Sequence, residues 1–62
     1  MKVATFYIID RRTKSIVNAV EAPSLDAADR VRRSLVDGEH CYLRTEPPME
    51  MLEAYRYWYE RP

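Results

Sequence analysis

His40 and Cys41 are the residues of this 62-residue chain best suited to nucleophilic catalysis, and they are adjacent. A cysteine nucleophile needs a base within hydrogen-bond reach. We expect both residues to lie in a strand, where neighbouring side chains point to opposite faces, so they cannot form a nucleophile–base pair. The sequence contains no second histidine. Cys41 is therefore expected to be a core thiol, and His40 a surface residue.

Other patterns for catalysis or cofactor binding are missing from the sequence. Gly38 is the only glycine, so there is no glycine-rich phosphate loop. Acidic residues are numerous, but none lies in an apolar stretch that would raise its pKa for acid–base work. One cysteine and one histidine cannot complete a zinc site. We therefore expect a protein that is not an enzyme and that uses no metal or other cofactor.

Two groups of basic residues could contact the phosphates of a nucleic acid. In the central helix, however, opposite charges four residues apart favour ion pairs along a solvated face: Asp26–Arg30, Asp29–Arg33 and Arg33–Asp37. Arg32 lies within the apolar arc, so its charged head should reach outward to water. Acidic and basic residues are equal in number, ten of each, which does not favour nucleic acid as the partner. Nucleic-acid binding is kept as the alternative, through Arg11, Arg12, Lys14, Arg32 and Arg33.

The C-terminal segment carries the strongest indication of function. It holds most of the aromatic residues: Tyr55, Tyr57, Trp58 and Tyr59. One arc of a helix here would carry apolar side chains, a pattern typical of a helix that closes a core: Met51, Leu52, Tyr55, Trp58 and Tyr59. Tyr57 and Met49 lie off that arc. Because Tyr, Trp and Arg dominate the hot spots of protein interfaces, we predict a partner-binding surface here, completed by the hairpin tip: Arg56, Tyr57, Trp58, Arg11 and Arg12.

Strands and helices in the order ββαβα are expected to position these residues. Runs of β-branched and aromatic residues predict strands at about residues 2–10, 15–22 and 39–45, of which the first two form a hairpin. Helices are expected at about residues 25–37 and 49–60. Ser24 is the expected N-cap of the first helix, and Gly38 is expected to end it in the left-handed conformation. Residues 1–62 thus predict one α+β domain: a three-stranded, mainly antiparallel sheet, a helix packed on one face, and a C-terminal amphipathic helix.

The alternation of side chains assigns residues to the two faces of this sheet. Apolar residues on both faces of the first strand suggest that it is central, or that its second face is covered; Tyr7 and Ile9 lie on one face, Phe6 and Ile8 on the other. In the second strand we expect Ile16, Val20 and Ala22 on one side and Val17 and Ala19 on the other. Cys41 and Leu43 are expected to face inward. The two sheet edges could accept a strand from a partner.

Length and composition favour a small protein that is stabilised by packing alone. A single cysteine excludes an intrachain disulfide, and a domain of this size without a metal or crosslink has little net stability. A structural subunit of a larger assembly, stable only as a homo-oligomer that buries more apolar area, is therefore a further hypothesis. The formal net charge of zero does not indicate a nucleic-acid mimic. No segment resembles a signal peptide or a membrane span, so the expected compartment is the cytoplasm.

The strand that runs into a Ser-Leu-Asp-x-Ala helix start, at residues 17–28, resembles a pattern in small phage-encoded host-takeover proteins. Phage inhibitors of the host RNA polymerase and compact anti-CRISPR proteins have a similar strand–strand–helix–strand plan, matched here over about residues 3–45. The resemblance implies a protein that binds and inhibits a larger macromolecular complex. It transfers no catalytic residue. The aromatic C-terminal helix and the neutral charge differ from the pattern in those proteins.

Overall fold

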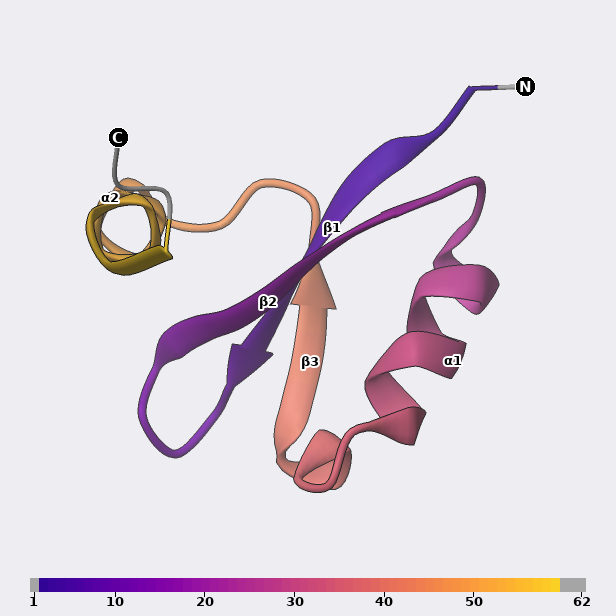
Figure 1. The fold of residues 1–62 in the computed structure, drawn as a ribbon, viewed down its shortest axis with the longest axis horizontal. Coiled ribbons are helices and arrows are strands. Elements are labelled where there is room, and N and C mark those ends of the chain that lie inside the picture. The colour runs from indigo at the N-terminus through magenta and orange to yellow at the C-terminus, as the bar shows by residue number, and fades with distance from the viewer. Residues whose placement is uncertain (1, 60–62) are drawn as a thin grey trace.

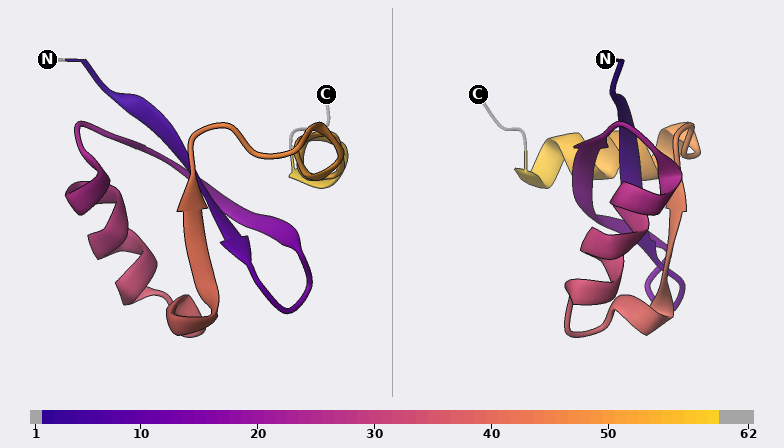
Figure 2. Two further views of the ribbon diagram at one scale, coloured as in Figure 1. Left: turned by 180° about the vertical axis from the view of Figure 1, so that it is seen from behind. Right: turned by 90° about the vertical axis from the view of Figure 1, so that its right-hand side faces the viewer.

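The computed structural model describes residues 2–59, which form a three-stranded antiparallel sheet and two helices. The elements follow the order β1 (Ala4–Asp10), β2 (Ser15–Ala22), α1 (Leu25–Ser34), the 3-10 helix η1 (Gly38–His40), β3 (Cys41–Arg44) and α2 (Met49–Tyr59). The strand order is β2-β1-β3, so β1 is central. The sheet lies between the two helices (Figures 1 and 2). The expected α+β class and ββαβα order are confirmed.

The core lies between α1 and the sheet face that carries Phe6. Phe6, Ala22 and Ala28 are buried together, and three partly buried residues pack against them: Val20, Ala27 and Leu43. The strand register places these residues on one face of the sheet, because Phe6 pairs with Val20, and Ile8 pairs with Leu43. The opposite face carries Tyr7 and Ile9, as their alternation with Phe6 and Ile8 predicts.

A β-bulge in the hairpin moves Ile16 to the face opposite the one we expected. Ile8 pairs with Asn18, but the next residue, Ile9, pairs with Ile16, so Val17 has no partner across the ladder. One extra residue reverses the alternation beyond it. The expectation that Ile16 shares a face with Val20 and Ala22 is therefore wrong. Ile16 instead lies with Ile9 on the α2 side, where it is 3% exposed.

The buried carboxylate of Asp10 organises the turn between β1 and β2. Its Oδ1 accepts hydrogen bonds from the backbone N–H groups of Arg12 at 2.7 Å and Thr13 at 3.4 Å. Its Oδ2 forms an ion pair with Arg12 Nη2 at 3.1 Å. These interactions close a turn in which Lys14 has a φ of 55°, a left-handed conformation that is uncommon for lysine.

The lowered pKa of Asp10 predicts how the stability of the fold changes at acid pH. The Arg12 side chain, and next the Arg12 backbone N–H, lower the pKa of this carboxyl from 3.8 to about 2. A lowered folded-state pKa stabilises the fold above the unfolded pKa, and this stabilisation is lost as the pH falls from about 4 towards about 2. We expect the urea midpoint of Asp10→Asn to fall less steeply than that of the natural protein over this range. Glu21→Gln controls for the removal of one acid, and equal slopes for the natural protein and Asp10→Asn would contradict the prediction.

The start of α1 is as expected, but its end is not. The Ser24 hydroxyl accepts a hydrogen bond from the Ala27 backbone N–H at 3.2 Å, which confirms the N-cap. The helix ends at Ser34 rather than near residue 37, because Leu35 is already extended. Gly38 does not adopt the left-handed conformation that we expected, since its φ is not positive. It begins η1, so Glu39 and His40 lie in a 3-10 helix rather than in the third strand.

Gly38 is buried because the chain after α1 folds back against the last turn of the helix. A Cβ atom placed on Gly38 would lie 2.0 Å from the carbonyl oxygen of Arg32. The Arg32 guanidinium donates to the Gly38 carbonyl oxygen at 2.6 Å and also pairs with Asp29 at 2.7 Å. Arg32 therefore joins α1 to η1 and does not extend freely into water as expected. Only glycine fits this close backbone approach.

Candidate functional site

α2 lies across the second face of the sheet, where it contacts β2. The ring of Tyr55 meets the ring of Tyr7 edge-to-face, with centroids 6.4 Å apart. Three side chains of α2 are half-buried: Met51, Leu52 and Tyr55. No residue of α2 is fully buried. The helix thus covers the sheet while most of its own surface remains open to solvent.

The exposed aromatic residues of α2 gather in its last turn, and Met49 is exposed at its start. Tyr57, Trp58 and Tyr59 are 60%, 67% and 65% exposed, and Met49 at the start of the helix is 63% exposed. The rings of Tyr57 and Trp58 meet edge-to-face at 5.2 Å, and those of Tyr55 and Tyr59 are 5.0 Å apart. We refer to this surface, which also includes the exposed Arg56, as the α2 surface: Met49, Arg56, Tyr57, Trp58 and Tyr59.

The apolar arc of α2 closes the core only in part. We expected Trp58 and Tyr59 to pack on the sheet with Met51, Leu52 and Tyr55, but both are exposed. Both residues border an open hollow with Ser15 and Ile16 at the start of β2, so they lie beside the sheet without being covered by it. The last residue of the predicted helix, Glu60, lies outside the described residues.

Acidic side chains flank the α2 surface. Glu50 and Glu53 are exposed on α2, and Glu46 is exposed just before it. Within residues 2–59 none of the three carboxylates forms an ion pair. Aromatic rings with nearby carboxylates attract cationic side chains, through the ring face and through charge.

The hairpin arginines lie at a different place from the α2 surface. Arg11 lies over the ring of Tyr42, with its guanidinium carbon 5.4 Å from the ring centroid. Arg12 pairs with Asp10 and, at 3.5 Å, with Asp37 beside η1. The structure therefore separates the predicted partner-binding residues into two groups, one on α2 and one beside β3 and η1.

The arginines of the alternative nucleic-acid surface are largely paired with carboxylates. Asp29 binds both Arg32 at 2.7 Å and Arg33 at 2.6 Å, and these side chains lower the pKa of Asp29. Arg12 is held by Asp10, and Lys14 occupies the turn. Of the three helix pairs expected from spacing, only Asp29–Arg33 forms among the described residues. A phosphate would have to compete with these carboxylates for the arginines.

Cys41 and His40 do not form a reactive pair. Cys41 is buried, and its Sγ lies 3.5 Å from the backbone carbonyl oxygen of Asp37. Burial, followed by the charge of Asp10, raises the pKa of the thiol, which disfavours the thiolate that a nucleophile requires. His40 lies 3.5 Å from the Glu39 carboxylate. Within residues 2–59 no three His, Cys, Asp or Glu side chains converge as metal ligands.

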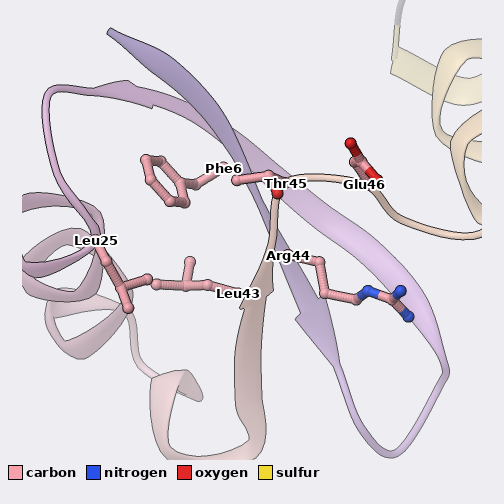
Figure 3. A pocket seen from close by; sticks show the side chains of 6 residues that line it. All are labelled: Phe6, Leu25, Leu43, Arg44, Thr45 and Glu46. Atoms are coloured by element: carbon pink, nitrogen blue, oxygen red, sulfur yellow. The ribbon is translucent and has the colours of Figure 1, made fainter.

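A groove runs along the outer edge of β3, and sequence reasoning did not identify it. Its upper end is lined by Phe6, Leu25, Leu43, Arg44, Thr45 and Glu46. Leu25 and Leu43 point toward each other beneath Phe6, while Arg44 points away from them (Figure 3). Leu25 is 59% exposed although it is apolar. The available signal was the position of Leu25 at the margin of the apolar face of α1. We call this feature the β3 groove.

No helix within residues 2–59 is long and apolar enough to cross a membrane. Comparison with protein-family models, with curated proteins and with solved structures finds no match to this chain.

Proposed function

We propose that this protein is a non-enzymatic protein–protein interaction module whose main contact is the α2 surface. The observation that carries the proposal is that α2 has no buried residue and ends in three adjacent exposed aromatic side chains. Isolated exposed apolar residues are ordinary, but a group of this kind marks an interaction site. Burying one such side chain stabilises a complex by about 1.5–3 kcal/mol.

The chemistry of the α2 surface supports a partner with a basic rim. Tyr and Trp are the side chains most enriched at interface hot spots. The flanking carboxylates of Glu46, Glu50 and Glu53 have no cationic partner among the described residues, so a partner's Lys or Arg side chains could pair with them.

The finer proposal concerns the partner. We propose a phage or mobile-element protein that acts in the cytoplasm as an inhibitor or regulator of a larger host complex. Three properties support it: the small size, the lack of an activated nucleophile in Cys41, and the resemblance of residues 3–45 to host-takeover proteins. A small protein without a catalytic group acts on a larger one by occupying its surface.

Affinity purification with matched variants tests the α2 surface. We expect N-terminally tagged protein to retain a specific partner from a lysate of cells that express the gene. Tyr57→Ser/Trp58→Ser should reduce the amount of recovered partner at least tenfold. The complex would lose two aromatic side chains that the partner buries, which should cost more than about 1.4 kcal/mol of binding free energy. Val36→Ser is the matched control: Val36 is 99% exposed, apolar, and distant in sequence from α2.

Two results would contradict this proposal. One is equal recovery of the partner with the natural protein and the Tyr57→Ser/Trp58→Ser variant, when circular dichroism shows that both are folded. The other is the absence of any protein that the natural chain retains more strongly than the variant does.

A further inference from the structure

The two edges of the sheet differ in whether they can accept another strand. We propose that the free edge of β3 pairs antiparallel with β3 of a second copy of this chain, around a two-fold axis at Leu43. The result is a symmetric dimer with one continuous sheet. This interface uses the β3 groove and is separate from the α2 surface.

The backbone pattern shows which groups face the free edges. Residue pairs in an antiparallel ladder alternate between hydrogen-bonded and non-hydrogen-bonded. The backbone N–H of Arg11 donates to the His40 carbonyl at 2.9 Å, so the alternation makes Ile9–Tyr42 and Tyr7–Arg44 the bonded pairs. Leu43 therefore directs its N–H and carbonyl away from β1. Along β2, the same reasoning directs Ala19 and Glu21 outward.

The β2 edge is protected against pairing. The outward N–H of Ala19 donates to the side-chain oxygen of its neighbour Asn18 at 2.8 Å. The bulge at Val17 also interrupts the regular spacing that an added strand would need. A bulge is a device that natural sheets use to prevent edge-to-edge association, and the occupied N–H of Ala19 removes one donor that an added strand would need.

The β3 edge lacks such protection at Leu43 and Thr45. The N–H of Thr45 makes no hydrogen bond within the described part of the chain. Only Cys41, at the start of the strand, has its N–H occupied, by the Gly38 carbonyl. In the dimer, Leu43 of each copy donates to and accepts from Leu43 of the other. Thr45 of each copy donates to the Cys41 carbonyl of the other.

A second copy fits this edge on both faces of the sheet. On the α1 face, Leu43 lies next to Ile8 of its own chain and would meet Leu43 of the second copy. These side chains form an apolar row across the dimer, and Leu25 lies beside it. On the other face, Arg44 is paired across the ladder with Tyr7 and lies opposite Tyr42 of the second copy. Arg44 is exposed and has no carboxylate partner among residues 2–59.

Charge complementarity is what identifies the second copy as the occupant. In the proposed register, Arg44 of one copy lies between Tyr7 of its own chain and Tyr42 of the other copy. No two side chains of like charge lie directly opposite each other. Within one chain Arg11 already lies over one face of the Tyr42 ring, with the guanidinium carbon 5.4 Å from the ring centroid, so the proposal assigns Arg44 of the second copy to the other face of that ring. Because the same surface serves both copies, the contact closes after two chains. β3 has only four residues, so the dimer should form and dissociate with concentration.

Sedimentation velocity across a concentration series tests the dimer. We expect the natural protein to shift from monomer to dimer as the concentration rises. Thr45→Pro removes an N–H that has no partner in the monomer, and the strand conformation of Arg44 suits a residue before proline. It should raise the dimer dissociation constant about tenfold or more. Glu21→Pro, which removes an outward N–H at the protected β2 edge, should leave the dissociation constant unchanged.

A second variant keeps the proposal testable if Thr45→Pro disturbs the fold. Leu25→Glu places a carboxylate beside the apolar row at an exposed position, and it should also give a monomer. A natural protein that remains monomeric at the highest soluble concentration would overturn the proposal, as would a dimer that survives both variants. Dimer loss in Tyr57→Ser/Trp58→Ser but not in Leu25→Glu would place self-association on α2 and would also overturn it.

Discussion

Gly38→Ala is expected to remove most of the stability of the protein, although it adds only one methyl group. That methyl carbon would lie 2.0 Å from the carbonyl oxygen of Arg32, which belongs to the backbone and cannot rotate away. Either the last turn of α1 or the start of η1 must move, and the 2.6 Å bond from Arg32 to the Gly38 carbonyl would be disturbed. We expect a loss of about 3 kcal/mol, comparable with the whole stability of a domain this small.

Urea unfolding followed by circular dichroism measures this loss. Val36→Ala, two residues earlier at a position 99% exposed, is the matched control and should change stability by less than about 0.5 kcal/mol. In an ordinary loop, replacing glycine with alanine stabilises a protein by about 0.4–1 kcal/mol, because the unfolded chain loses freedom. A Gly38→Ala variant as stable as the natural protein would show that the backbone approach is not required.

The parts of the fold that follow from local patterns were predictable from the sequence. The β-branched and aromatic run at residues 4–10 predicts a strand. Its two apolar faces allow either a central position or a covered second face, and the strand order, which the sequence left open, makes β1 central. Ser24 begins α1 through a hydrogen bond to a backbone group three residues away, within reach of a sequence pattern. Such features depend on residues that are close together in the chain, so the order of residues in a short segment is enough to predict them.

The features that sequence reasoning missed depend on contacts between separate segments. The bulge that moves Ile16 to the other face depends on how β2 aligns with β1. Gly38 indicated the end of a helix, but the reason for glycine is the position of Arg32 against it. The groove beside β3 likewise depends on where Leu25 of α1 stands relative to Leu43. No spacing within one element encodes these distances.

The candidate site also depends on contacts between segments that the sequence pattern does not give. Helical periodicity places Trp58 and Tyr59 on the arc of α2 that faces the sheet, and the helix does form there. Whether they are buried depends on how far the sheet extends beneath them. Both are exposed although they border a hollow with Ser15 and Ile16 of β2, so the aromatic surface is larger than the off-arc residue Tyr57 alone would give.

The two proposed surfaces have a combined consequence. A dimer through β3 would carry two α2 surfaces on one rigid sheet. If the partner is itself a symmetric or repeated assembly, the second contact is intramolecular and its effective concentration is high. Binding of the natural protein to an immobilised partner should then dissociate more slowly than binding of Thr45→Pro, although each α2 surface is unchanged.

Ile9→Ala should cost about 2–5 kcal/mol, the other large loss of stability that we expect. Ile9 lies in the central strand on the α2 side, and it is 0% exposed. Ile9 pairs with Ile16, which lines a hollow together with Ala54 and Tyr55 of α2, so we attribute this burial to α2. Ile9→Val, which removes a single methylene group, should cost only about 0.5–1.5 kcal/mol. If α2 spent much of its time away from the sheet, Ile9 would be hydrated already and both variants would unfold at the urea midpoint of the natural protein. A large difference between the urea midpoints of Ile9→Ala and Ile9→Val therefore shows that α2 is packed on the sheet. Its exposed aromatic residues then project from a helix that is fixed in place.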